Sequence, residues 1–549
     1  MYQSLTDTIY LERKRAEKKL TKDALALLRR AQNVEADASV GDLLRELEQA
    51  IWKRRPILGE IISKNAHKSL YDYTQGFIDV NPAKGLEHRK AELIEMVQAL
   101  VIERLGTEVG QGVARQLSKM LLVSTADHHG PINNPFFVNS NIISAIPYVN
   151  ILDNDIKYLI DFSFASISVN NSSFPRGVEF NGDTGEVVRI PILPDKLKMG
   201  VAYTMRSFTE GDLDRAFSLI SEKEKEGHLT PERSSLIQDY IRTYFGRTEV
   251  LNSSNFVSQI TKLNYAMWPS FFSRKIGQSR SSVPGRVPDL VYVEIETLVA
   301  RLLLRHHIGT KDSLLHKLLF DSQYHQLVLK FFNNLPGAFS LQKGWGSFLF
   351  WTLDDKGRRV SLFLRDGRLV SANGEQSFTL TPEAIADSLE KQIFFPGMLL
   401  CYLVVALYYG VKCLGGFSQV HDLTVVKNAW RQFLQEAGEA DEANAIIPIQ
   451  TKELGGDGMV LAYVPSNVHG MVPAFGLEIG IGQVDTSFEE YIEYAKMVTV
   501  SEALAPLMPE VYNVLFSQDE RQPHLTKLKS ADIVKFVGMV DKLTNGRRK

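Results

Sequence analysis

The chain has 549 residues, which is more than one hydrophobic core supports, because single cores stop growing at about 250–300 residues. Hydrophobic residues make up 44%, charged residues 23% and aromatic residues 10%, which excludes a mainly disordered, collagen-like or coiled-coil protein. With 62 basic and 64 acidic residues the net charge is −2, so the chain as a whole lacks the positive field that dominates nucleic-acid affinity. The composition predicts a globular protein of several domains.

Residues 1–122 are predicted to form a helical N-terminal region, because apolar positions recur at helical spacing through 20–31, 40–52 and 89–105. Between Tyr10 and Arg30, eight Lys or Arg residues face three Asp or Glu residues. This excess suits an RNA or acidic partner, but a solvated helix face is the more common cause.

The N-terminal sequence has no apolar core followed by a small-residue cleavage site, and Cys401 and Cys413 are the two cysteines of the chain. Neither an exported destination nor a disulfide framework is therefore expected, and we predict a cytoplasmic protein.

A mixed α/β domain is predicted for residues 123–340. Strand-like runs occur at 136–138, 159–169 and 186–193. Further helices are expected where Thr209 and Asp212 fit a capping box and where Thr230 precedes a proline. The segment 277–288 is rich in Gly, Pro and Arg and is expected to be an exposed loop, followed by a helix near 292–306.

Residues 341–549 are predicted to form an α+β C-terminal domain. Residues 345–380 alternate in polarity and contain turn signals at 355–357 and 366–367, which indicates a small antiparallel meander. A helix start is expected at Thr381-Pro382 and a capping box at Ser487 and Glu490. Further elements are expected as helices at 397–412, 421–437, 488–497 and 501–516 and a strand at 459–464.

One uncharged run of 19 residues, 393–411, is near the length that crosses a bilayer. Pro396 and Gly397 interrupt it and Lys412 follows at once, so a buried helix is expected, with no membrane span.

Strands cluster between helical blocks instead of alternating strictly with helices. The sequence therefore predicts an α+β fold of several domains, rich in helix, with a central mixed or antiparallel sheet and a small β-meander.

The most unusual local chemistry is the run Asp127-His128-His129, and no phosphate-binding loop, H-E-x-x-H or G-x-S-x-G motif occurs in the chain. Carboxylate and imidazole groups ligate divalent metals or move protons near neutral pH. If the run is extended, Asp127 and His129 point to one side and could share one divalent metal ion or a proton, while His128 faces the other side. The alternative is a structural bend.

The run DHH is similar to the metal-binding triplet of the DHH phosphoesterases. That family also has earlier aspartates in strand-end loops, whereas here Asp153-Asn154-Asp155 lies downstream. We therefore do not assign the chain to that family.

Several polar residues are candidates for substrate binding. Arg176 in a turn could hold a carboxylate or phosphate in two-pronged fashion with Lys196 in support, and His421 follows a glycine pair between two apolar segments. The other candidates are carboxamides, namely Asn133, Asn134, Asn139, Asn141 and Asn171.

These features favour an enzyme that acts on a small polar or anionic metabolite. We expect a hydrolase or transferase, with or without a metal ion, and Asp127, His128 and His129 as its catalytic residues. The main alternative is a non-enzymatic binding or assembly protein that uses the charged N-terminal helices. A homo-oligomer is also possible, because apolar helices could pair between subunits. Local RNA binding is a third hypothesis.

Overall fold

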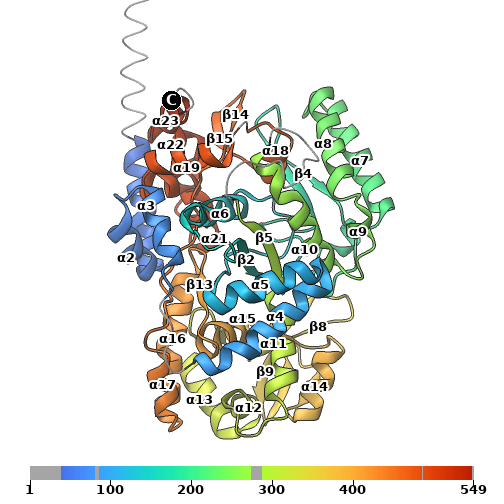
Figure 1. Cartoon of the computed structure of the whole chain (residues 1–549), viewed down its shortest axis with the longest axis vertical. Coiled ribbons are helices and arrows are strands. Elements are labelled where there is room, and N and C mark those ends of the chain that lie inside the picture. The colour runs from blue at the N-terminus through green and yellow to red at the C-terminus, as the bar shows by residue number, and fades with distance from the viewer. Residues whose placement is uncertain (1–38, 81–85, 274–286, 485, 547–549) are drawn as a thin grey trace, which may run out of the picture.

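The computed structural model describes residues 39–80, 86–273, 287–484 and 486–546 (Figure 1). The basic segment between Tyr10 and Arg30 and most of the predicted loop 277–288 lie outside these residues. Helices dominate, and the strands form several small sheets. The structure thus confirms the mixed α+β class.

A four-stranded sheet lies at the centre of the molecule. Its strands are β1 (Leu122–Ser124), β2 (Tyr158–Ser163), β5 (Asp289–Glu294) and β13 (Lys412–Leu414). The order is β13-β1-β2-β5, and every neighbouring pair is parallel. The outer strand β13 comes from the C-terminal third of the chain, so segments far apart in sequence meet in this sheet.

The two faces of this sheet pack into two different hydrophobic cores. Successive side chains of a strand point to opposite faces. Ile160 and Phe162 of β2 join one core with α4 (Lys90–Leu105) and α5 (Thr107–Lys119), whereas Leu159 joins the other core. Burial on both faces explains why these strands are nearly continuous apolar runs.

The predicted meander is confirmed as part of a five-stranded antiparallel sheet, with strand order β11-β10-β9-β8-β12. Its strands are β8 (Phe350–Leu353), β9 (Arg359–Arg365), β10 (Arg368–Ser371), β11 (Ser377–Thr379) and β12 (Phe395–Pro396). Gly357 and Gly367 of the two predicted turns have φ of 70° and 71°, a left-handed conformation that glycine adopts without steric strain.

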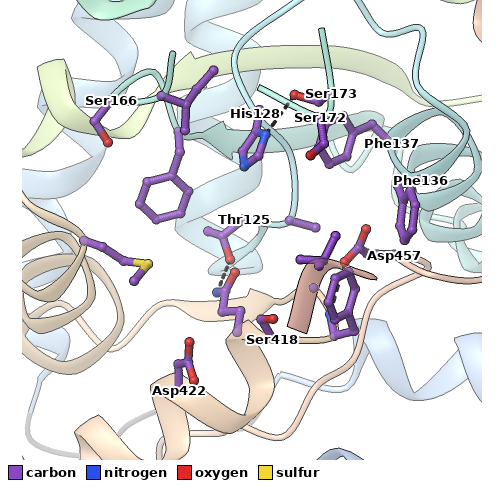
Figure 2. A pocket seen from close by; sticks show the side chains of 18 of the residues that line it. Thr125, His128, Phe136, Phe137, Ser166, Ser172, Ser173, Ser418, Asp422 and Asp457 are labelled. Atoms are coloured by element: carbon purple, nitrogen blue, oxygen red, sulfur yellow. Dashed lines mark hydrogen bonds between the residues drawn. The ribbon is translucent and has the colours of Figure 1, made fainter. Parts of the chain in front are cut away.

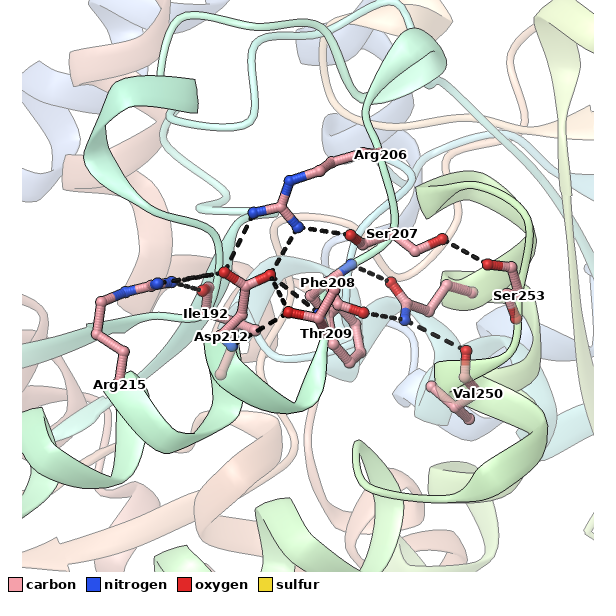
Figure 3. Close-up of polar contacts among 10 residues, drawn as sticks. Ile192, Arg206, Ser207, Phe208, Thr209, Asp212, Arg215, Val250 and Ser253 are labelled. Carbon is pink, nitrogen blue, oxygen red and sulfur yellow. Dashed lines mark hydrogen bonds and ion pairs between the residues drawn. The ribbon is translucent and has the colours of Figure 1, made fainter.

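The predicted helix starts are also confirmed. Thr209 and Asp212 form a capping box at α7 (Glu210–Lys225), and Arg206 and Arg215 donate to the same Asp212 carboxylate (Figure 3). The other confirmed starts belong to α8 (Pro231–Tyr244), α14 (Pro382–Glu390) and α19 (Phe488–Met497).

The apolar run 393–411 is mostly buried, as predicted, although Ile393 and Met398 are exposed. It forms α15 (Met398–Cys401) and a π-helical turn, η9 (Tyr402–Tyr408). The expected helix to residue 412 was too long, because Lys412 already belongs to β13. Among the residues that the structure describes, no helix has the length and apolar character needed to cross a membrane.

Four predicted elements need correction. The strand expected at 459–464 begins only at β14 (Tyr463–Ser466). The expected strand at 136–138 lies in α6 (Pro135–Ala145), because the Asn134 side chain caps the helix and proline occupies its first position. The helix expected from 292 begins only at α11 (Ile295–Leu302), after β5. The helix expected at 501–516 is divided into α20 (Val500–Leu504), η10 (Ala505–Leu507) and α21 (Met508–Leu515).

The remaining elements surround these sheets, and residues 39–54 form a further helix. The other helices are α2 (Pro56–Asn65), α3 (Leu70–Gln75), α9 (Thr248–Leu251), α10 (Phe256–Met267), α12 (Leu314–Phe320), α13 (Ser322–Phe332), α16 (Gln419–Glu436), α17 (Ala440–Ala445), α18 (Gly476–Gly480), α22 (Ser530–Phe536) and α23 (Met539–Gly546). The other strands are β3 (Gly177–Asn181), β4 (Val187–Pro191), β6 (Phe339–Ser340), β7 (Trp345–Gly346), β14 (Tyr463–Ser466) and β15 (Gly470–Pro473).

Candidate functional site

A cavity of about 710 Å³ lies at the carboxyl ends of three strands of the parallel sheet (Figure 2). Its lining includes residues 125, 126 and 128 after β1, residues 164, 166 and 167 after β2, and residues 416–419 after β13. The carboxyl ends of parallel strands share one edge of a sheet, where ligand pockets commonly form. The volume is that of a site for a small organic molecule.

Two helices begin at this pocket. Asn134 caps α6, and Gln419 begins α16, where its side chain donates a hydrogen bond of 2.5 Å to Thr125 Oγ1 (Figure 2). This bond joins the end of β1 to the start of α16. A Cβ on Gly416 would collide with Asp457 Oδ2, so a side chain at this position would displace the Asp457 carboxyl group.

Aromatic side chains from several elements form much of the pocket wall. The ring centroids of Phe136 and Phe417 are 5.8 Å apart, and those of Phe164 and Tyr402 are 6.0 Å apart. Ring pairs at such distances pack favourably. The other lining aromatics are Phe137, Trp345 and Trp351.

His128 lines the pocket with its imidazole held in a defined orientation. Its Nδ1 lies 2.9 Å from Ser173 Oγ and 3.0 Å from Asn171 Nδ2, and Asn171 Oδ1 accepts hydrogen bonds from the backbone N–H and the hydroxyl of Ser173. No described residue hydrogen-bonds to Nε2. Burial, assisted by the Arg359 charge, lowers the pKa of His128 to about 4, so the ring is neutral near neutral pH and its Nε2 is available to a ligand.

Three carboxyl groups also line the pocket, on Asp422 in the first turn of α16, Asp457 before β14 and Glu510 of α21. Burial raises the pKa of Asp422 to about 6, against the opposing charge of Arg55, and raises the pKa values of Asp457 and Glu510 to about 7. Groups with such pKa values exchange protons readily near neutral pH.

His129 does not face the pocket, although the sequence analysis placed it at the centre of the site. Its side chain is fully buried, with Nδ1 2.8 Å from Ser163 Oγ and Nε2 2.8 Å from the Val257 carbonyl oxygen. Both ring nitrogens are therefore occupied within the protein. The expected alternation exists, but His128 is the member that faces the cavity.

Asp127 is also fully buried and lies outside the pocket lining. Its Oδ2 accepts hydrogen bonds from Asn141 Nδ2 at 2.5 Å and from the Tyr292 hydroxyl. Burial, and then the charge of Asp161 on β2, raise the pKa of Asp127 well above its ordinary value. The described residues contain no group of three or more His, Cys, Asp or Glu side chains that could hold a metal ion, and the side chains of Asp127 and His129 form hydrogen bonds with different partners.

The other predicted residues divide between the pocket and the framework. Asn134 lines the pocket and Asn171 orients His128. His421 is buried one residue before Asp422, with Nδ1 lacking a partner among the described residues, and does not line the cavity.

The framework residues stabilise backbone elsewhere. Asn133 accepts from the Leu477 N–H, and Asn139 accepts from the N–H groups of Leu461 and Ala462. Arg176 pairs with Asp195 at 2.6 Å, and Lys196 is exposed. Neither Arg176 nor Lys196 lines the pocket.

The sequence analysis did not select Asp422, Asp457 and Glu510. Asp457 stands in the glycine-rich run 455–458, which is typical of a turn and gave a weak signal. No sequence feature pointed to Glu510, because its place in the pocket lining depends on how α21 packs.

Comparison of the chain with models of protein families and with curated protein sequences finds no match.

Proposed function

We propose that the chain is an enzyme that binds a small organic substrate in this pocket and catalyses proton transfer on it. The observation that carries the proposal is His128, a neutral imidazole whose Nε2 is free for a ligand and which lines a cavity of about 710 Å³ at the carboxyl ends of parallel strands.

In this proposal His128 Nε2 forms a hydrogen bond with a polar atom of the substrate, while Asp457 and Glu510 accept or deliver protons. Carboxyl groups with pKa values of about 7 are well matched to this role, because general acid–base catalysis is most efficient when the pKa is near the working pH. The aromatic wall holds the apolar part of the substrate. Asp127 and His129 then support the framework around the pocket.

Among the described residues, the pocket lining contains three carboxyl groups and one guanidinium group, that of Arg359. Arg359 already donates to the Ser166 carbonyl oxygen at 2.6 Å and stacks over Trp351 at 4.1 Å. These features favour a neutral or cationic substrate over the anionic metabolite expected from the sequence.

The test is to incubate the purified chain with a mixture of small metabolites extracted from cells and to follow consumption and formation by mass spectrometry. Ala126→Trp places a large side chain in the cavity and is expected to abolish both, whereas Leu152→Trp, at a position that is 81% exposed, is expected to leave them unchanged. Binding without turnover would support the non-enzymatic alternative. Turnover that survives Ala126→Trp would contradict the proposal.

A second variant pair tests the orientation of His128. Asn171→Leu removes the amide beside His128 Nδ1 and is expected to lower kcat/KM about fivefold, in line with roughly 1 kcal/mol for one hydrogen bond. The exposed neighbouring asparagine provides the matched control, Asn170→Leu. Equal activity of the two variants would remove His128 orientation from the mechanism.

A further inference from the structure

The described lining of the pocket has more acidic than basic side chains. Asp422, Asp457 and Glu510 line it together with one cation, Arg359, whose guanidinium is engaged with Trp351 and the Ser166 carbonyl oxygen. Among the described residues, Arg55 is the only cation that forms an ion pair with one of these acids, and its Nη2 lies 3.8 Å from Asp422 Oδ1.

Two of these carboxyl groups are deeply buried yet incompletely bonded. Asp457 is 4% exposed and accepts the Phe417 N–H at Oδ2, while no described residue donates to its Oδ1. Asp422 is 7% exposed, and its Oδ1 accepts no hydrogen bond from the described residues. A buried acid without a full set of partners gains strongly from a cation that enters beside it.

The walls beside these acids suit an organic cation. Phe136, Phe417, Phe164 and Tyr402 present aromatic surface to the cavity, and aromatic faces attract ammonium groups through the ring quadrupole. Asp422 and Asp457 flank Ser418 at the start of α16 (Figure 2). An inorganic cation would use the carboxylates but would leave the apolar volume unfilled.

We propose that the ligand of this pocket is an organic cation, with an ammonium group attracted by the negative charge of Asp422, Asp457 and Glu510 and an aromatic or aliphatic body packed against the aromatic wall. This inference rests on the proposed function, because it names the class of its substrate.

The test uses three indole probes of similar shape with the full chain: tryptamine as the cation, tryptophol as the neutral probe and indole-3-acetate as the anion. Isothermal titration at pH 8 is expected to show tryptamine binding at least tenfold more tightly than indole-3-acetate. Ala126→Trp is expected to abolish the binding. No measurable binding of tryptamine, or equal binding of all three probes, overturns the inference.

Variants assign the charge preference to individual acids. Asp422→Asn and Glu510→Gln are each expected to weaken tryptamine about fivefold or more while changing tryptophol affinity little, and retained tryptophol binding shows that the variant is folded. Glu383→Gln, on the exposed face of α14, is the matched control. Loss of affinity for both probes in equal measure would contradict a charge role.

The pH dependence provides a separate readout. The titratable and charged groups that face the ligand are His128, Arg359, Asp422, Asp457 and Glu510, with Arg55 behind Asp422 and the phenol of Tyr402 beside it. Tryptamine affinity is expected to fall between pH 8 and pH 5.5, because the carboxyl groups take up protons over this range. Affinity that is constant or rises as the pH falls would contradict the inference. Metabolite turnover without cation preference would overturn it and leave the proposed function standing.

Discussion

Replacement of Asp161 by asparagine is expected to stabilise the protein at pH 8 and to have a smaller effect at pH 4. Asp161 is fully buried on β2 next to Asp127, and neither of its carboxyl oxygens accepts a hydrogen bond of ordinary geometry from the described residues. Burial raises its pKa to about 7, and the nearby Ser124 hydroxyl opposes this only in part.

The sign follows from proton linkage. Between pH 4 and pH 7 the folded state keeps the proton on Asp161 while the unfolded state loses it, so stability falls as the pH rises through this window. The rise in pKa from 3.8 to about 7 spans about three pH units, and at about 1.4 kcal/mol per unit this amounts to about 4 kcal/mol.

Asparagine removes this loss, and it also removes the charge that raises the pKa of Asp127. The buried amide that it introduces offsets part of the gain, because an unsatisfied polar group costs about 1–3 kcal/mol. A net stabilisation of about 1–3 kcal/mol at pH 8 is therefore expected.

Urea unfolding followed by intrinsic fluorescence at pH 4, 6 and 8 measures this effect. The control is Asp155→Asn, since Asp155 is an exposed carboxylate whose hydrogen bond from Lys119 lowers its pKa and which should therefore lack the pH-8 gain. A variant that unfolds at lower urea concentration than the native protein at pH 8, or that retains the native pH dependence, would refute the reasoning.

Three further outcomes are expected. Arg104→Leu leaves Glu294 as an unpaired buried carboxylate and should destabilise the protein by about 3–5 kcal/mol in chemical denaturation, with much of the loss recovered when Glu294→Leu is added. Gly416→Ala drives a Cβ into Asp457 Oδ2 and should weaken tryptamine binding at least tenfold by titration, with only a modest fall in melting temperature. Thr209→Ala removes the capping box of α7 and should lower stability by about 1 kcal/mol in urea unfolding.

The features predicted correctly from sequence are those with local causes. The capping boxes at Thr209 and Ser487 and the turns of the meander depend on residues within a few positions of each other. The run Phe136–Val138 was assigned wrongly, because aromatic and β-branched residues favour strands while Asn134 and Pro135 fix a helix start.

The residues of the candidate site, in contrast, are brought together by contacts between distant parts of the chain. Alternation along an extended segment places His128 opposite Asp127 and His129, but the side that meets a cavity depends on distant segments. On the inner side, the Val257 carbonyl oxygen of α10 lies within hydrogen-bond distance of His129 Nε2. On the outer side, the walls are built by residues 416–419 and by Glu510.

The parallel sheet explains why these groups converge without a sequence motif. Neighbouring parallel strands need long crossover connections, so β1 and β13 bring Thr125 and Gln419 into hydrogen-bond contact although 294 positions separate them. Acidic residues that carry the proposed cation preference lie on loops and helices that follow the last of these strands. Because these acids are far apart along the chain, each one looks in the sequence like an ordinary solvated surface residue. Burial beside the apolar pocket, which the sequence does not reveal, raises the pKa values of Asp457 and Glu510.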